Sequence, residues 1–378
     1  MTLFGWLTDR SVGAAIGLLH KAVAANAFFY LALGLHKPHM PWQAAAEDWA
    51  KHPLSQIDLP THQQPPVGMP PIAFHMSEAC PTCKPPTHPT PYVPLPPDDV
   101  RNARRAYRAA TTGMDRKLGV FVSELEALGV RDETAIVLHG DHGWQLGEHG
   151  AWRKFTNFEL GTRVPLIISA PWITNQPKRS DALVELVDVL PTIAELAGVP
   201  LPTGEIFDGI SMAPLLLVPS EMTRGVAWPK VAAFSQYPKK VSPGHPEWEK
   251  NGIIHSARES FTHMGCSIRV DNWRMTEWVV WNQTALRPMW VTSNGMDGCD
   301  HHTYTQHTLP SRFVLELTHA LVFGWLRVAA RELYDHRATR DYPTDFNQDE
   351  NVNVANQTEH AAVIVTLSAR LHAQFGSQ

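Results

Sequence analysis

One short apolar run and the polar loop behind it constrain this chain more than any other stretch. Residues Thr134–His139 are apolar and β-branched, and Gly140 ends the run. This pattern predicts a fully buried strand. The loop that follows reads DHGWQLGEHGAWRK, from Asp141 to Lys154. Because catalytic groups of an open α/β sheet gather at the carboxyl ends of its strands, the loop is the predicted site.

The loop combines three kinds of polar side chain. Asp141 offers a hard anionic oxygen suited to Ca²⁺ or Mg²⁺, and His142 and His149 can ligate a metal or move a proton. Lys154 is a compact cation suited to an oxyanion, and Arg153 precedes it. The combination indicates a metal-assisted site for an anionic ester. From these residues alone, a plain turn with an Asx-type hydrogen bond remains an alternative for Asp141 and His142.

Hydrophobic periodicity around this site predicts alternating helices and strands, which is α/β order. A helix that begins near Asp98 presents one apolar stripe to a sheet, can bend at Thr111–Gly113 and ends at Gly129. The other predicted elements are a helix over 10–25, buried strands over 28–33 and 164–169, a helix over 181–196 interrupted at Pro191, a strand over 231–235, a hairpin of strands 265–270 and 274–281, and a helix over 311–330.

Two domains are expected, over residues 1–224 and 225–378, with the boundary near Arg224. The proline-rich stretch 41–97 predicts an extended surface excursion, because it cannot sustain helices or central strands. This stretch contains Cys80 and Cys83, for which a local disulfide or free thiols are expected.

Charge and hydropathy exclude some classes of function. The net charge of −5 argues against nonspecific nucleic-acid binding, which needs a basic surface. The apolar run 28–35 is too short to cross a bilayer, so no transmembrane segment is predicted. The stretch Met1–Arg10 has no basic region before an apolar core, so it does not predict a secretory signal. The sequence does not fix the oligomeric state.

Several motifs in one order resemble the type I sulfatases of the alkaline phosphatase superfamily, and within them the iduronate-2-sulfatase branch. The run DHGWQLGEHG from Asp141 is followed by WRK at Trp152 and RVPLI at Arg163. The other matching stretches are HKPHMP at His36, LVDVLPT at Leu186, DGIS at Asp208, SQYP at Ser235, GCSIR at Gly265, EWV at Glu277 and ELYD at Glu332.

The resemblance implies a fold and an activity. The expected fold is the alkaline phosphatase-like sulfatase α/β sandwich, incomplete at its N-terminus, with a smaller C-terminal antiparallel-sheet domain. The expected activity is hydrolysis of sulfate esters on glycosaminoglycan-type sugars. Sulfatases use Ca²⁺ and a formylglycine made from a cysteine in a Cys-x-Pro-Ser-Arg type motif. A family member of full length would be lysosomal or secreted.

The resemblance also assigns roles by matching position. It makes Asp141 a Ca²⁺ ligand and His142 the neighbour that completes the metal and nucleophile environment. It gives His39, His142 and Lys154 catalytic roles, with His39 and Lys154 on the sulfate group. Residues expected at the sugar substrate are Lys37, Trp144, His149 and Arg153.

The sequence departs from the family in its first half. Neither the formylglycine motif nor the paired metal-binding aspartates is found, and Cys80-Pro-Thr-Cys83-Lys lacks the Pro-Ser-Arg order. The leading hypothesis is therefore the carboxyl-terminal portion of a sulfatase, truncated or completed by a part encoded elsewhere. The alternatives are an inactive protein that binds sulfated glycans through Lys37, His39, Arg153 and Lys154, or a phosphohydrolase of the same superfamily, which would need a Ser or Thr nucleophile and more metal ligands.

Overall fold

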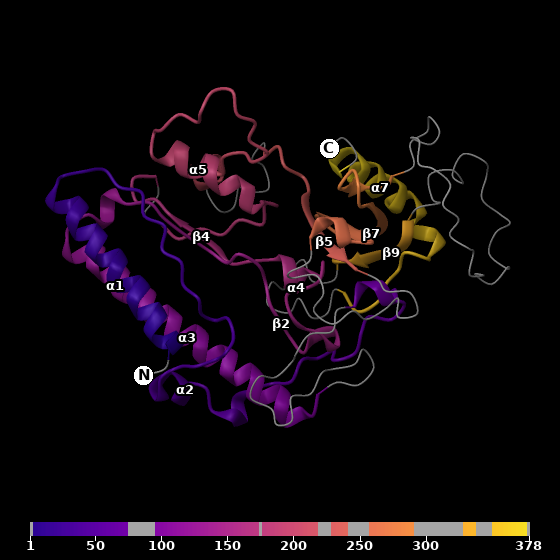
Figure 1. Ribbon diagram of the computed structural model, residues 1–378, viewed down its shortest axis with the longest axis horizontal. Helices are drawn as coiled ribbons and strands as arrows, with labels where there is room; N and C mark the ends of the chain where they lie inside the picture. Colours follow the sequence, from indigo (N-terminus) through magenta and orange to yellow (C-terminus); the bar gives the residue numbers. More distant parts are fainter. Residues whose placement is uncertain are drawn as a thin grey trace. The chain divides into compact units, whose positions relative to one another are not determined.

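Two compact units make up the chain, which is mixed α/β (Figure 1). The computed structural model describes residues 3–74, 95–173, 176–217, 228–240, 257–290, 328–337 and 350–375. Unit 1 comprises Met1–Gln64, Ser77–Lys154 and Arg163–Val231, and unit 2 comprises Pro65–Met76, Phe155–Thr162 and Ala232–Gln378. The proposed boundary residue Arg224 lies outside the described residues.

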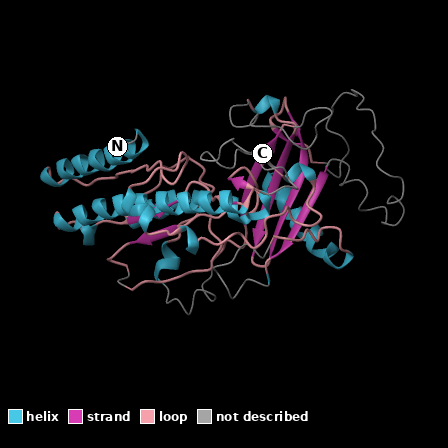
Figure 2. Cartoon of the chain, turned by 90° about the horizontal axis from the view of Figure 1, so that it is seen from below, coloured by secondary structure: helices cyan, strands magenta, loops and turns pink. Residues whose placement is uncertain are grey.

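Two long helices form one side of unit 1. Helix α1 (Leu3–Ala24) packs beside α3 (Pro97–Ala127), as Figure 2 shows. The predicted apolar stripe of α3 is buried along its first half, and a bond between the His20 ring and the Glu124 carboxylate, 2.6 Å long, joins the helices. Helix α3 runs without interruption through Thr111–Gly113. The left-handed φ of +72° at Gly129 follows the helix end that the sequence predicts.

Among the described residues of unit 1 there are also four short strands and three short α-helices. Strand β1 (Ile136–His139) pairs antiparallel with β4 (Leu166–Ser169), and β2 (Gln145–Leu146) with β3 (Trp152–Arg153). The helices are α2 (Ala46–Ala50), α5 (Val189–Leu196) and α6 (Ala213–Leu217). The predictions that β1 is fully buried and that β4 is buried are wrong, because every residue of both strands keeps some exposure.

The prediction of a buried strand over residues 28–33 is also wrong in this structure. These residues have no regular secondary structure, Phe28 is fully exposed and Tyr30 is 76% exposed. A strand needs a neighbour for its backbone hydrogen bonds, and none of the described residues provides one. The run is apolar, but apolar composition alone does not supply a neighbouring strand.

The proline-rich stretch is more compact than the expected surface excursion. Its described part, up to residue 74, contains α2 and two 3₁₀ turns at Leu54–Gln56 and Pro71–Ala73. Trp42 and Phe74 in this stretch are buried. Proline restricts helices and central strands but does not prevent neighbouring aromatic side chains from entering a core. Cys80 and Cys83 lie outside the described residues.

The helix predicted over 181–196 is shorter than expected. It begins as a 3₁₀ turn at Leu186–Asp188 and continues as α5, and Gly198 follows with a φ of +65°. Pro191 is the third residue of α5, so it lies in the first turn, where no intrahelical partner for its missing N–H is needed. The proline therefore marks the start of the α-helix and does not interrupt it.

Unit 2 is built on one antiparallel sheet of order β5-β6-β7-β8, with β9 also paired to β7. The strands are β5 (Ala233–Lys239), β6 (His263–Val270), β7 (Trp273–Asn282), β8 (Arg287–Pro288) and β9 (Val328–Asp335). The predicted hairpin is confirmed, with Asp271 and Asn272 as its turn. Residues 328–330, expected in a helix, belong to β9, and residues 311–327 lie outside the described part.

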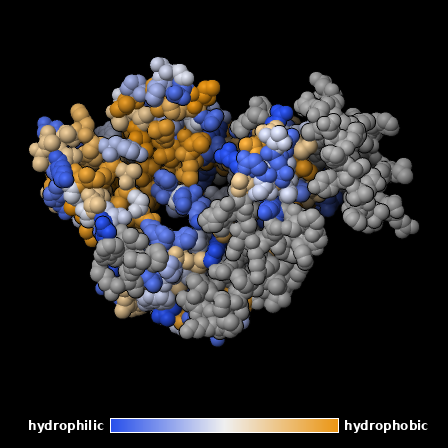
Figure 3. Space-filling model, viewed as in Figure 1, coloured by the Kyte–Doolittle hydropathy of each residue, from blue (hydrophilic) through white to orange (hydrophobic). Residues whose placement is uncertain are grey.

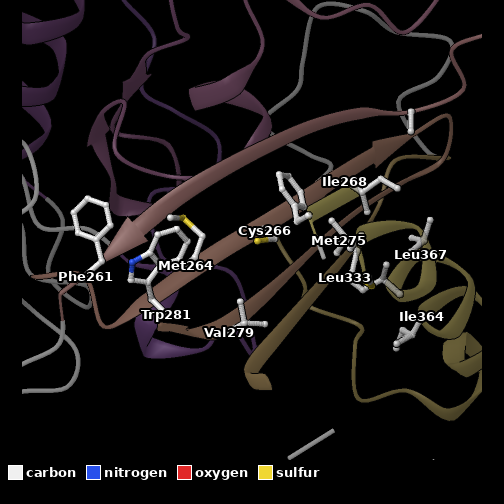
Figure 4. Packing of buried hydrophobic residues seen from close by; sticks show 13 residues of the cluster. Phe261, Met264, Cys266, Ile268, Met275, Val279, Trp281, Leu333, Ile364 and Leu367 are labelled. Atoms are coloured by element: carbon white, nitrogen blue, oxygen red, sulfur yellow. The ribbon is translucent and has the colours of Figure 1, made fainter. Parts of the chain in front are cut away.

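Helix α7 (Ala361–Phe375) closes the core of unit 2 over this sheet. Figure 4 shows Leu367 and Ile364 of α7 near Ile268, Met275 and Leu333 of the sheet. A short helix, α4 (Glu159–Thr162), also belongs to this unit. None of the helices in the described ranges is long and apolar enough to cross a membrane.

Candidate active site

The loop after β1 is held from two sides within unit 1. The Gly140 amide donates to the Pro165 carbonyl at 3.2 Å, which extends the β1–β4 pairing to the start of the loop. Farther along, the Arg104 guanidinium of α3 donates to the Leu146 carbonyl at 3.1 Å and to the Glu148 carboxylate at 2.7 Å. Gly147 has a φ of +100° and packs against Pro60 and Trp152, so a side chain there would be strained. The loop is therefore fixed at its start and near its middle.

A second loop, His36–Pro41, brings His39 to the same place. The buried Lys37 ammonium donates to the carbonyls of His39 and Pro41, both in its own loop. Burial lowers the pKa of Lys37. In this structure Lys37 therefore braces the loop that carries His39, and its predicted contact with substrate stays a prediction.

His39 is oriented by the backbone of the next residue. Its Nδ1–H donates to the Met40 carbonyl at 2.7 Å, and because a carbonyl oxygen only accepts, this bond assigns the proton to Nδ1. Burial lowers the pKa of His39, the bond to Met40 opposes that change, and the positive charges of Lys154, His36 and Arg153 lower the pKa further. Near neutral pH the ring is therefore neutral, with its Nε2 lone pair available to a ligand.

Trp144 lies at the centre of the cluster. Its ring centroid is 5.6 Å from that of His39 and 6.0 Å from that of His142, and the Lys154 Nζ lies 5.8 Å from it. The structure thus brings three predicted catalytic side chains, those of His39, His142 and Lys154, around the indole ring of Trp144. They come from two loops that are about 100 residues apart in the sequence.

Two aromatic residues that the sequence did not assign to the site pack against the ring of Trp144. Tyr107 of α3 stacks on Trp144 at 5.9 Å, and Trp42 meets it edge-on at 6.4 Å. Burial raises the pKa of Tyr107 to about 12, so it remains a neutral wall. Tyr107 was visible in the sequence as part of the apolar stripe of its helix, but a stripe does not identify its partner. Trp42 directly follows the His39 loop, and that position was its only signal.

The two cations of the loop lie close together. Burial lowers the pKa of Lys154, the Asp141 carboxylate raises it, and Arg153 lowers it. Arg153 has a left-handed φ of +69°, and its guanidinium lies 4.0 Å from the Met40 sulfur. A partly desolvated ammonium beside a second cation is a favourable setting for an anion, because attraction is stronger away from bulk water.

His149 is placed differently. It is buried, has a φ of +58°, and its backbone amide donates to the His62 carbonyl at 3.0 Å. Its side chain is buried, so a role in shaping a sugar pocket stays a prediction.

The described residues do not by themselves fit a Ca²⁺ ion. The Asp141 side chain is largely exposed, accepts from the His142 amide at 3.1 Å and lies 3.5 Å from the His142 ring. Within the described ranges, no three His, Cys, Asp or Glu side chains converge. Calcium takes six to eight oxygen ligands, so one carboxylate and one imidazole are too few. Asp141 and His142 remain predicted ligands that need further donors.

Cys266 offers no replacement for the expected nucleophile. It lies on β6 in unit 2, is fully buried, and burial raises the pKa of its thiol. A buried neutral thiol within a sheet is inert.

Comparison with known proteins agrees with the motifs. The family model described as Sulfatase matches residues 7–199. Iduronate 2-sulfatase of Mus musculus is 30% identical over an alignment of 324 residues, and the match covers 73% of this chain and 56% of that protein. The Homo sapiens iduronate 2-sulfatase is 30% identical over an alignment of 329 residues, and the match covers 74% of this chain and 57% of that protein. The matches thus span just over half the length of these relatives.

Comparison with solved structures supports the same fold. A solved structure of a protein in complex with its substrate D-glucosamine-2-N,6-O-disulfate has a TM-score of 0.64 at 18% identity, and covers 97% of this chain and 69% of that one. At this identity the likeness concerns the fold, which is the alkaline phosphatase-like fold of the sulfatases. Together with the motifs gathered around Trp144, the family model shows that this chain belongs to the sulfatase family.

Proposed function

We propose that this chain forms the sulfate-binding part of an iduronate-2-sulfatase-like sulfuric ester hydrolase that acts on sulfated glycosaminoglycan-type sugars. The observation that carries the proposal is the placement of His39 and Lys154 beside the ring of Trp144. Sulfatase relatives with 30% identity support the class of reaction.

The cluster suits a sulfate ester electrostatically. A sulfate monoester carries one negative charge, and Lys154 and Arg153 supply positive charge from neighbouring positions. The Trp144 face, backed by Tyr107, offers a flat apolar surface of the kind on which a sugar ring can lie. In this proposal Lys154 and Arg153 hold the sulfuryl oxygens, and Trp144 orients the sugar.

His39 is the residue that exchanges a proton. Its Nδ1–H is committed to the Met40 carbonyl, so the Nε2 atom is the one that can meet the ester. An anion bound nearby favours the imidazolium form, which then donates from Nε2 to an ester oxygen. The proposed reaction also requires a nucleophile and further metal ligands. No step is assigned to them, because the described residues do not supply them.

Binding measurements test the proposal. The probe is a heparin-derived disaccharide with a 2-O-sulfated uronate, compared by calorimetry with its desulfated form. We expect the sulfated form to bind more tightly, and Lys154→Met to weaken it by about tenfold or more, as expected for a lost charged hydrogen bond. Lys51→Met, which removes an exposed lysine of unit 1, is the matched control. Equal affinity for both sugars would refute the proposal.

A second candidate is a catalytically inactive member of the family that binds sulfated glycans. The shortage of metal-binding carboxylates in the described residues favours it. Release of the phenol from an aryl sulfate separates the two candidates. Binding of the sulfated disaccharide without any turnover supports the inactive protein, whereas turnover that Lys154→Met reduces supports the hydrolase.

A further inference from the structure

An arginine of the long helix α3 reaches into the polar loop of the candidate site. Only 13% of the Arg104 side chain and 8% of the Glu148 side chain are exposed. The Arg104 guanidinium donates to the Glu148 carboxylate at 2.7 Å and to the Leu146 carbonyl at 3.1 Å. The second oxygen of that carboxylate accepts from the Leu146 amide at 2.5 Å. These hydrogen bonds form the Arg104 clamp, which holds both backbone polar groups of Leu146.

The Arg104 clamp acts on the strand pair that leads to the two cations of the site. Leu146 belongs to β2, and the pairing places Trp152 of β3 opposite Leu146 and Arg153 opposite Gln145. Lys154 follows β3 directly. A pair of strands of two residues each has little stability of its own, so its position depends on the contacts around it. A contact that fixes β2 therefore also fixes β3 and the start of Lys154.

The turn between β2 and β3 needs such support. Gly147 has a φ of +100°, and His149 and Arg153 have φ values of +58° and +69°, a region that side chains rarely adopt. Conformations of this kind persist only where surrounding contacts enforce them. The Glu148 carboxylate ties the turn to α3, and the bond from the His149 amide to the His62 carbonyl holds it from a second point.

Helix α3 also supports the indole ring beside Lys154. Tyr107 lies three residues after Arg104, and residues at this spacing share one side of a helix. Tyr107 stacks on Trp144 at 5.9 Å, and the Lys154 Nζ lies 5.8 Å from the centroid of the same ring. One side of α3 thus supports both the strand pair and the ring that meet at Lys154.

The placement of the two cations matters because part of unit 1 offers an anion no charge. Figure 3 shows hydrophobic residues gathered on the face of unit 1 that carries β4 and α5. Ile167 of β4 and Leu190 of α5 are both more than half exposed. An apolar surface does not hold a sulfate group, so binding depends on where Arg153 and Lys154 lie.

We infer that Arg104 is a positioning residue for sulfate binding. Through Leu146 and Glu148 it sets the place of Lys154 beside Trp144, while its own Nη1 is committed to the loop and does not meet the ligand. The inference rests on the proposed function, because it takes Lys154 as the group that holds the sulfate.

The position of Lys154 can be measured without any sugar. Reductive methylation with carbon-13 formaldehyde gives each lysine an NMR methyl signal, and the signal that Lys154→Met removes is that of Lys154. The ring current of Trp144 should displace this signal from those of exposed lysines. We expect Arg104→Gln to move it to the position of exposed lysines. An unchanged Lys154 signal in folded Arg104→Gln would overturn the inference.

The matched control is the next arginine of the same helix. Arg105 donates to the His52 carbonyl at 2.7 Å and lies over the Trp49 ring, so it does not take part in the Arg104 clamp. Arg105→Gln should leave the Lys154 signal in place, and an equal displacement in both variants would show a general disturbance of α3. If Arg104→Gln fails to fold in urea titrations, Glu148→Gln replaces it, because this variant keeps the shape but removes one acceptor oxygen of the clamp.

Calorimetry with the 2-O-sulfated disaccharide tests the effect on binding. We expect Arg104→Gln to weaken binding about tenfold, the loss of one charged hydrogen bond, and Arg105→Gln to leave it nearly unchanged. In a Lys154→Met background, Arg104→Gln should weaken binding no further, because residues that act as a unit are not additive. Additive losses would show that Arg104 acts on the ligand independently of Lys154, and would overturn the inference.

The two proposals fail in different ways. A Lys154 signal that Arg104→Gln displaces, in a protein that binds no sulfated disaccharide, would refute the proposed function and leave the position of Lys154 as inferred. Sulfated disaccharide that binds equally well to Arg104→Gln and to the unsubstituted protein would refute the role of Arg104 and leave the proposed function standing.

Discussion

Gly265 of β6 lies directly opposite Trp278 of β7 in the sheet of unit 2. A Cβ atom on Gly265 would lie 2.7 Å from the Cη2 and Cζ3 atoms of the Trp278 ring and 2.7 Å from Nδ2 of Asn157. The Asn157 amide also donates to the Gly265 carbonyl at 2.9 Å. The missing side chain of Gly265 thus makes room for a buried indole and an asparagine at once.

We therefore expect Gly265→Ala to destabilise the protein by about 1–3 kcal/mol, the usual range for overpacking a core. Gly119→Ala is the matched control, because Gly119 lies within α3 and a Cβ there meets no atom within 4 Å. This control should raise stability by about 0.5–1 kcal/mol, since alanine favours a helix over glycine. Urea unfolding measures the change in the free energy of unfolding that each variant causes. Changes of the same sign in both variants would contradict the packing described for Trp278.

Lys239 should make stability depend on pH. Its buried Nζ donates to the Phe74 carbonyl at 2.8 Å and lies 5.6 Å from the ring centroids of Tyr237 and Trp278. Burial lowers the pKa of Lys239 to about 7, while the charge of Glu332 opposes the change. Because the unfolded chain binds the proton more tightly, the free energy of unfolding should rise as pH increases from about 7 towards 10.5, by a few kcal/mol at most.

Lys239→Met should remove this rise. The slope of unfolding free energy against pH is the quantity to compare, because the variant also leaves the Phe74 carbonyl without its donor and so changes absolute stability. Lys240→Met, at the next position, should keep the slope of the unsubstituted protein. A Lys239→Met variant with the same slope between pH 7 and 10 would show that Lys239 is charged in the folded state.

A buried ion pair should be essential to unit 2. Arg274 pairs with Glu350, donates to the Thr276 hydroxyl at 2.7 Å and lies over the rings of Phe158 and Tyr334. Glu350 also accepts from the Glu159 amide at 2.7 Å. Arg274→Met would leave a buried carboxylate without its cation, at a cost of about 3–5 kcal/mol.

Chemical denaturation measures this effect. The control is Arg101→Met, which breaks an exposed pair with Asp98 on α3 and should leave the unfolding midpoint nearly unchanged. A double variant, Arg274→Met with Glu350→Gln, should recover part of the loss because it removes the uncompensated charge. If Arg274→Met unfolds at the same denaturant concentration as Arg101→Met, the pair does not stabilise unit 2.

Binding of a sulfated ligand should be linked to protonation of His39. The free protein has a His39 pKa below the usual 6.5, and a bound anion favours the charged ring. Affinity for the sulfated disaccharide should therefore rise as pH falls through the range below 6.5. Calorimetry in two buffers of different ionisation enthalpy should detect net proton uptake near pH 6. His39→Gln should abolish that uptake while Lys51→Met preserves it, and uptake that persists in His39→Gln would assign it to another group.

Local sequence patterns were sufficient where the interacting residues are close in the chain. The apolar spacing of α3 with Gly129 behind it, and the two β6–β7 runs around Asp271–Asn272, predicted those elements because helix turns and hairpin pairs join residues a few positions apart. The loop from Asp141 to Lys154 was predicted to be the site for the same reason, because the residue types on which that prediction rests lie close together in the chain.

Only the tertiary structure decided which residues meet across long stretches of chain. Tyr107 behind Trp144, Asn157 on Gly265 and Glu350 on Arg274 are pairs separated by 37 to 108 residues, and no local pattern encodes such partners. The run Phe28–Leu33 is the converse case. The sequence determined that it is apolar and able to form a strand, but a strand exists only beside a neighbour that accepts its hydrogen bonds, and the described fold provides none.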